Sequence, residues 1–311
     1  MSQTTNVNFS NPEEVFQFAD DSWHAGFYDD AKKYYLQSAD LYEKNSDNHG
    51  QASSLMRLAE LMISLDEYEQ ALPKLQHAFN LVKNADEEQL LAGDILIKTA
   101  KAYGAQNMEQ EAFATIAQAQ DVLENARYLD MLGDAFDYQA YLYLMQNNEG
   151  EALKAYMKAA KLYESERISL KEASVLRAIA RILMKQRQYD EAHDVLEKCR
   201  NLYRENGDLL GEASALSAIG SLRYIIKDIQ NARKALMKAV YLYSKVEYHF
   251  AEAEALLYLA RVEAYNKEQG DFERAKAHYK KSIRLFDFLE NDMMKNMVLE
   301  EYHNFLNRVC C

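Results

Sequence analysis

The sequence predicts an all-α solenoid in which seven similar helix pairs follow one another and a single helix closes the stack. The first observation is a recurring motif, in which an acidic and aromatic turn precedes an alanine. The second is the spacing of these alanines, which is 40, 41, 40, 40, 40 and 43 residues. They are Ala31, Ala71, Ala112, Ala152, Ala192, Ala232 and Ala275. The third is that apolar residues recur at three- and four-residue steps, which is the helical period. A fixed period of this length is typical of repeat proteins, which present a long surface rather than one closed pocket.

The motif also places the two helices of each pair. Another small residue stands twelve positions before each of the first six alanines, and Ala260 takes this place in the seventh copy if its turn holds three extra residues. The first six are Ala19, Ala59, Ala100, Ala140, Ala180 and Gly220. Two antiparallel helices approach closely only where a small residue of one faces a large side chain of the other. We therefore expect the small residues to mark the helix crossings.

Capping signals set the ends of the array. Asn11 and Pro12 form a helix start, because Asn is a preferred cap and Pro favours the first helical position. Residues 1–10 are polar and lack a helical apolar period, so we expect a disordered tail there. Residues 11–289 then hold the seven repeats. After Leu289 the motif stops, and Asn291 begins one more helix within residues 290–311, which we expect to cap the open face of the last repeat.

This pattern resembles the tetratricopeptide repeat, which has small residues at its eighth, twentieth and twenty-seventh positions. The twenty-seventh position is small in every copy: Ser38, Ala78, Ala119, Ala159, Cys199, Ala239 and Ser282. The resemblance covers about residues 12–289. The period exceeds the usual value of about 34 residues; in this it is similar to repeats of the kinesin light chain, the maltose-regulon activator and bacterial peptide-sensing Rap-type regulators. The resemblance implies a right-handed superhelix of seven such helix pairs, with the first helix of each pair lining a concave groove.

Composition restricts the partners. The net charge of −13 argues against nucleic acid, because phosphate binding needs net or patterned positive charge. No apolar run has the length of a signal peptide or a membrane span, so we expect a cytoplasmic protein. Of the three cysteines, Cys199 occupies a packing position and is expected to be a buried free thiol. Cys310 and Cys311 resemble the prenylation signal of Rab-type small GTPases, but no polybasic segment precedes them. We interpret the pair as a frayed helix end and expect no membrane partner.

Signals for catalysis are absent from the sequence. There is no Gly-rich phosphate loop and no His-Glu-x-x-His motif. The seven histidines are scattered without metal-binding spacing, and the acidic pairs fall at caps or on solvated faces. We therefore expect no catalytic residue, no metal site and no cofactor, and we predict that the protein is not an enzyme.

The resemblance implies that fixed positions on each first helix face the groove. Those selected as partner-binding residues are Trp23, Lys101, Asp137, Tyr141, Arg177, Arg181, Lys185, Tyr224 and Arg261. Arg177, Arg181 and Lys185 are four residues apart and so share one helix face. Beside Tyr141 and Tyr224 of the neighbouring repeats, this row suits a peptide carboxylate or an acidic side chain. An alternative stays open, in which these side chains only solvate the groove or pair with neighbouring acids.

The sequence therefore predicts a non-enzymatic scaffold or adaptor that binds a peptide or protein segment in the groove. The groove positions do not supply the Lys and Asn clamp of chaperone-binding arrays, which argues against the C-terminal tails of heat-shock chaperones as partners. A Rap-like regulator that senses a short peptide and controls a partner protein is the main alternative. Rap-type proteins carry an additional amino-terminal effector region, whereas the repeats here begin at about residue 12, which favours the scaffold. An enzyme that uses the array as its body is a second alternative, without a catalytic constellation to support it.

Overall fold

The computed structural model describes residues 11–265 and 269–309, and within these ranges the chain consists of α-helices, short turns and one 3-10 helix, η1 (Asp86–Glu88). The predicted tail at residues 1–10 and the cysteines Cys310 and Cys311 lie outside the described residues. The first eight helices are α1 (Pro12–His24), α2 (Tyr28–Lys44), α3 (Asn48–Ser64), α4 (Tyr68–Val82), α5 (Gln89–Ala105), α6 (Glu109–Ala126), α7 (Leu129–Met145) and α8 (Glu149–Ser165). The others are α9 (Ser169–Lys185), α10 (Tyr189–Glu205), α11 (Leu209–Ile225), α12 (Ile229–Lys245), α13 (His249–Tyr265), α14 (Gln269–Phe288) and α15 (Asp292–Val309). The prediction of an all-α repeat fold is confirmed, with the odd-numbered helices α1 to α13 as the first members of the pairs.

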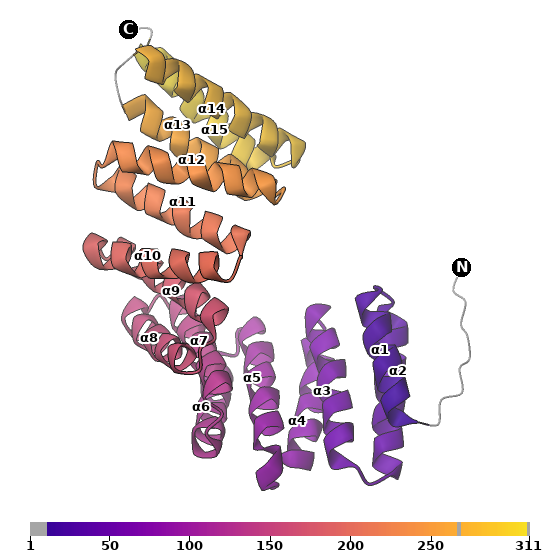
Figure 1. Cartoon of the computed structure of the whole chain (residues 1–311). Coiled ribbons are helices and arrows are strands. Elements are labelled where there is room, and N and C mark those ends of the chain that lie inside the picture. The colour runs from indigo at the N-terminus through magenta and orange to yellow at the C-terminus, as the bar shows by residue number, and fades with distance from the viewer. Residues whose placement is uncertain (1–10, 266–268, 310–311) are drawn as a thin grey trace, which may run out of the picture. The chain divides into compact units, whose positions relative to one another are not determined.

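The chain divides into two compact units. Residues up to Leu162 form the first unit and residues from Tyr163 form the second. Within each unit, the helices pack against their neighbours in chain order (Figure 1). The division falls inside α8, which explains why no linker or change of composition marks it in the sequence. Among the described residues, no helix combines the length and hydrophobicity that are needed to cross a membrane.

Regular turns separate the helices. Most helices have 17 residues, and a residue with positive φ recurs 20 residues apart from Asn107 to Glu247. In the turn after α11, Lys227 has a φ of 67°, its N–H donates to the Tyr224 carbonyl at 3.1 Å, and the Asp228 N–H donates to the Arg223 carbonyl at 2.8 Å. Such bonds satisfy carbonyls that the helix end leaves free. Few of these residues are glycines, so the turn type is not evident from composition.

The small residues mark the helix crossings, as expected. All seven motif alanines are fully buried. A Cβ atom added at Gly220 would lie only 2.5 Å from the Cγ of Leu236 on the partner helix. Real Cβ atoms do not approach other heavy atoms so closely, so the two helices of this pair are too near for a larger residue.

In some repeats the residue at the twenty-seventh position also forms a hydrogen bond, which the small-residue pattern did not predict. The Ser38 hydroxyl donates to the Pro12 carbonyl at 2.9 Å, and the Ser282 hydroxyl donates to the Ala253 carbonyl at 2.8 Å. The Cys199 thiol makes the equivalent contact with the Ala173 carbonyl at 3.2 Å. Cys199 is a buried free thiol, as predicted, and burial raises its pKa to about 12. These contacts connect three second helices, α2, α10 and α14, to the first part of the first helix of the same pair.

Helix α15 is the last helix that the structure describes. It packs on α14, and its buried Val298 and Phe305 share a core with Tyr279 and Phe286 of α14. The helix therefore stands where the first helix of a further repeat would begin. Its position brings polar side chains of α15 to the first helix α13, where they take part in one of the sites described next.

Candidate protein-interaction surface

The predicted partner-binding residues all lie on first helices, and they divide between the two units. Trp23, Lys101, Asp137 and Tyr141 belong to the first unit, on α1, α5 and α7. Arg177, Arg181, Lys185, Tyr224 and Arg261 belong to the second unit, on α9, α11 and α13. The surroundings of the two sets differ.

Trp23 is engaged by its own unit. Its half-buried ring meets Tyr35 edge to face, with ring centroids 6.3 Å apart. The Arg57 guanidinium of α3 lies 4.6 Å from the indole centroid, a cation–π distance. The same guanidinium donates to Asp20 and to Glu60, each at 2.8 Å. A large part of the Trp23 surface is therefore already covered by an internal contact.

The charges of the first unit continue in a ladder across the first helices. Glu60 also receives a hydrogen bond from Lys98 of α5 at 2.9 Å, and Lys98 pairs with Asp94 at 3.6 Å. We call Asp20, Arg57, Glu60, Lys98 and Asp94 the paired-charge ladder. Burial tends to raise the pKa of Glu60, but the hydrogen bonds and charges of Lys98 and Arg57 outweigh it and hold that pKa below its ordinary value. The charge of Glu60 is thus stabilised by its two partners, whereas burial, together with the charge of Glu60, raises the pKa of Asp94.

Farther along the first unit, aromatic surface is exposed. Lys101 is exposed, and its ammonium lies 5.9 Å from the centroid of the Tyr138 ring. Tyr138 stacks on Tyr141 at 5.7 Å, and Tyr141 remains 47% exposed. Asp137 is partly buried on the same helix. Lys101 and Tyr141 therefore offer contact area that the fold does not cover.

The basic row of the second unit lies along the exposed side of α9. Arg177, Arg181 and Lys185 are all exposed, as their four-residue spacing predicts. Within the described part of the chain, Arg181 has no hydrogen-bond or ion-pair partner. Arg177 borders a hollow of about 410 Å³, which we call the tyrosine hollow. Its other lining residues are Tyr203, Asp208, Leu210, Gly211, Ser214, Tyr243, Tyr248, Phe250, Ala251 and Glu254.

The tyrosine hollow contains both polar and apolar groups. Burial raises the pKa of the Tyr243 hydroxyl to about 12, and burial also raises the pKa of the Glu254 carboxyl. Leu210 and Phe250 remain partly exposed at its edge. The hollow therefore offers apolar contact area beside a guanidinium, which suits a side chain or a terminus of a bound segment.

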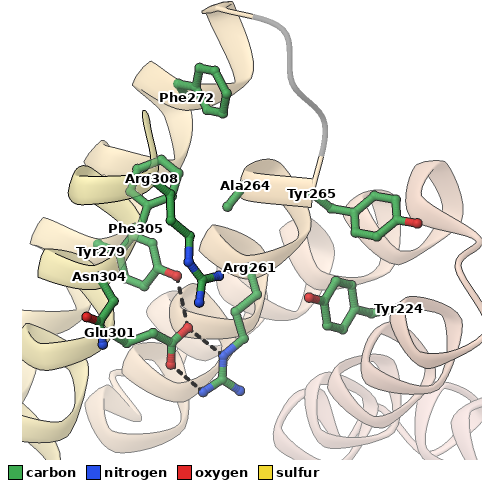
Figure 2. Close-up of a pocket in the computed structure, with 10 residues that line it drawn as sticks. All are labelled: Tyr224, Arg261, Ala264, Tyr265, Phe272, Tyr279, Glu301, Asn304, Phe305 and Arg308. Carbon is green, nitrogen blue, oxygen red and sulfur yellow. Dashed lines mark hydrogen bonds and ion pairs between the residues drawn. The ribbon is translucent and has the colours of Figure 1, made fainter. Parts of the chain in front are cut away.

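Tyr224 and Arg261 line a second hollow, of about 540 Å³, which we call the terminal hollow (Figure 2). Arg261 is held by Glu301 of α15 in a two-bond pair: Nε donates at 2.8 Å and Nη2 at 2.7 Å. The Tyr279 hydroxyl donates to the same carboxylate at 2.9 Å. Sequence reasoning did not select Glu301, although it stands 40 residues after Arg261 and so at the equivalent repeat position. The structure thus brings Tyr224 and Arg261 together, while Arg177 borders a different hollow.

Comparison with protein families finds repeat models. Two models described as tetratricopeptide repeat match residues 14–84 and 171–240, and residues 255–286. A model of the soluble NSF attachment protein matches residues 75–204. Comparison with the curated proteins finds no match.

Solved structures share the fold. The apo form of RapI is 12% identical, with a TM-score of 0.63, over 90% of this chain and 98% of that one. Aspartyl phosphate phosphatase F from Bacillus subtilis is 13% identical, with a TM-score of 0.64, over 89% of this chain and 70% of that one. Repeats of a putative kinesin light chain from Podosopora anserina are 17% identical, with a TM-score of 0.51, over 64% of this chain and 99% of that one. At these identities the likeness concerns the fold.

Proposed function

Because the chain belongs to the tetratricopeptide-repeat family, we propose that it is a non-enzymatic scaffold or adaptor that binds a peptide or protein segment on its first helices. The observation that carries this proposal is the basic row on α9. Arg181 is exposed and has no internal partner among the described residues, and Arg177 borders the tyrosine hollow. Arg181 is therefore available to a partner, unlike the paired charges of the first unit.

The chemistry of the row selects an acidic or carboxylate-bearing partner. Guanidinium groups bind carboxylates through two parallel hydrogen bonds, and tyrosines supply rigid contact area at interfaces. The partner's acidic group would lie on Arg177 and Arg181, with an apolar group in the tyrosine hollow. The net charge of −13 favours a protein over a nucleic acid as the partner, and the composition favours the cytoplasm.

A capture experiment with matched variants tests this function. The wild-type chain and the double variant Arg177→Ala/Arg181→Ala are immobilised, and proteins retained from the native cell extract are identified by mass spectrometry. The partner is then titrated against both forms. We expect the double variant to lose about tenfold or more in affinity, with a nearly unchanged melting temperature, because exposed charges contribute little to stability.

The control is the double variant Arg204→Ala/Lys234→Ala, which removes the same charge from exposed positions on the second helices α10 and α12. It should retain the partner at wild-type affinity. If both double variants bind the partner equally weakly, the loss of affinity is caused by the change in net charge, and the assignment of the binding surface to α9 is wrong. A large loss of melting temperature in the α9 variant would assign the arginines to the packing of neighbouring repeats.

A peptide-sensing regulator is the second candidate. It is favoured by the structural likeness to RapI, which extends over 98% of that chain. The same purification separates the two functions. A protein partner of defined stoichiometry supports the scaffold, whereas a short peptide that copurifies and is lost from the α9 variant supports the sensor.

A further inference from the structure

The terminal hollow contains a cluster of charges at the α15 end that the proposed function does not use. Among its lining residues are Arg261, Arg308 and Glu301. Outside the lining, the Lys227 ammonium lies 5.2 Å from the ring centroid of Tyr224 and 4.9 Å from that of Tyr265. Three cations thus surround the hollow, and Glu301 is its one carboxylate among the described lining residues. In a chain with a net charge of −13, this local excess of positive charge favours an anionic ligand.

Of the two arginines that line the hollow, Arg308 is available to such a ligand. Arg261 is bound through Nε and Nη2 to Glu301, so its donor fork is occupied. Arg308 is exposed and has no hydrogen-bond or ion-pair partner in the described ranges. In Figure 2 its guanidinium extends into the hollow toward Arg261 and Glu301. A guanidinium with free donors matches the geometry of a carboxylate.

The rest of the hollow is aromatic. Tyr224 and Tyr265 meet edge to face, with ring centroids 6.4 Å apart, and Figure 2 shows both rings on the side of the hollow opposite α15. Phe272 and Phe305 line it from α14 and α15, and their ring centroids are 6.0 Å apart. A volume of about 540 Å³ lies within the range of sites that bury small organic groups. Rings of this kind favour another ring in an edge-to-face or offset arrangement.

We propose that the terminal hollow binds a carboxylate that is attached to an aromatic ring. The carboxylate lies on Arg308, and the ring lies among Tyr224, Tyr265 and Phe272. The C-terminal aromatic residue of a peptide and a free aromatic acid both present this chemistry. No residue of the basic row on α9 lines the hollow, so variants of that row distinguish this site from the proposed function.

Three defined probes test the site by isothermal titration calorimetry on the full chain. They are acetyl-Gly-Gly-Phe with a free carboxylate, the same tripeptide as the C-terminal amide, and 3-phenylpropionate. We expect a free carboxylate to bind about tenfold more tightly than the amide, because the amide cannot form the ionic contact. Binding of the tripeptide alone identifies a peptide end, and binding of phenylpropionate at equal affinity identifies a small acid. The proposal is overturned if neither carboxylate probe binds, or if the amide binds as well as they do.

Variants locate the binding. Arg308→Ala should weaken the probe that binds by about tenfold or more, and Arg308→Lys should restore part of the loss. Arg204→Ala removes an exposed arginine of the same unit outside the hollow and should have no effect. Tyr265 is 47% exposed, so its replacement is tolerated by the fold; Tyr265→Ala should weaken binding and Tyr265→Phe should preserve it. Unchanged affinity in both Arg308→Ala and Tyr265→Ala would place the probe elsewhere and overturn the site.

One further variant separates this site from the proposed function. The double variant Arg177→Ala/Arg181→Ala should bind the aromatic carboxylate as the wild type does, even where it loses the protein partner. Loss of probe binding in that variant would place the probe on α9 and overturn the assignment to the terminal hollow.

Discussion

The first helices of the two units carry charges at equivalent repeat positions, but the charges have different surroundings. In the first unit, Asp20 and Glu60 are paired with Arg57 and Lys98 of the next first helix. In the second unit, Arg181 occupies the position equivalent to Asp20 and Glu60 and has no partner among the described residues. The same repeat position can therefore hold a charge that is paired with a neighbouring helix or a charge without such a partner among the described residues.

The difference has a local cause that repeats along the chain. Arg57 and Lys98 each stand two residues before the small residue of their helix, Ala59 and Ala100. The equivalent position before Gly220 is occupied by Ala218, which is uncharged and cannot form an ion pair with Arg181. Asp20 and Glu60 are thus paired because the next repeat carries a charge of opposite sign at that position, whereas Arg261 is paired with Glu301 of α15.

The largest expected effect is on stability. It tests whether the helix pairs of both units pack in the same way, as the comparison of equivalent repeat positions requires. Ala152 of the first unit and Ala192 of the second are both fully buried at a helix crossing. Replacement of either by Leu should overpack the crossing and lower the free energy of unfolding by about 1–3 kcal/mol. Urea denaturation followed by circular dichroism measures this loss. Ala105→Leu, at an exposed position at the end of α5, is the control. A neutral result at both buried sites would mean that the motif does not mark the crossings.

The next effect tests the comparison directly through one arginine from each unit. Arg57→Ala removes the cation that contacts Asp20, Glu60 and the Trp23 ring. We expect a loss of about 1–2 kcal/mol, since partly buried hydrogen bonds to charged groups are broken. Arg181→Ala should change stability by less than about 0.5 kcal/mol, as exposed substitutions usually do. Chemical denaturation of both variants under the same conditions measures the loss in the free energy of unfolding. Equal losses would show that the two arginines do not differ in their internal contacts.

The smallest effect is a pH dependence of opposite sign in the two units. The pKa of Glu60 in the folded chain lies below its ordinary value of 4.5, so its stabilisation is present above that pH and is lost as the pH falls through the lowered value. Glu60→Gln should therefore be less stable than the wild type at pH 7, and the difference should shrink below about pH 4.5.

Glu254 of the tyrosine hollow should behave in the opposite way. Burial raises its pKa above 4.5, so its favourable contribution is present below that pH and is lost as the pH rises through the raised value. Glu254→Gln should be more stable than the wild type at pH 7, with the gain vanishing at low pH. Thermal melts of both variants between pH 3 and about pH 8 check the signs. The same sign in both would contradict the assigned environments.

The sequence by itself determined the architecture. The seven alanines, the earlier small residues and the twenty-seventh positions predict the helix crossings. Each repeat packs mainly against its immediate neighbours, so the residues that pack recur in the sequence at a fixed spacing. The α9 row followed from its spacing in the same way, since residues four apart share a helix face. The division of the chain into two units left no mark in the sequence, because it falls inside α8, a helix of ordinary composition.

Only the tertiary structure decided which of the selected residues have partners within the chain. Trp23 is covered by Arg57, and Arg261 is bound by Glu301, although the sequence presented both as candidates for a partner. The contact of Arg261 with Glu301 joins residues 40 positions apart, and the guanidinium of Arg308 extends into the same hollow from α15 (Figure 2). The physical reason is that a charge pair depends on the reach and direction of two side chains across adjacent helices. The period places the two helices next to each other, whereas the folded chain decides which side chains meet.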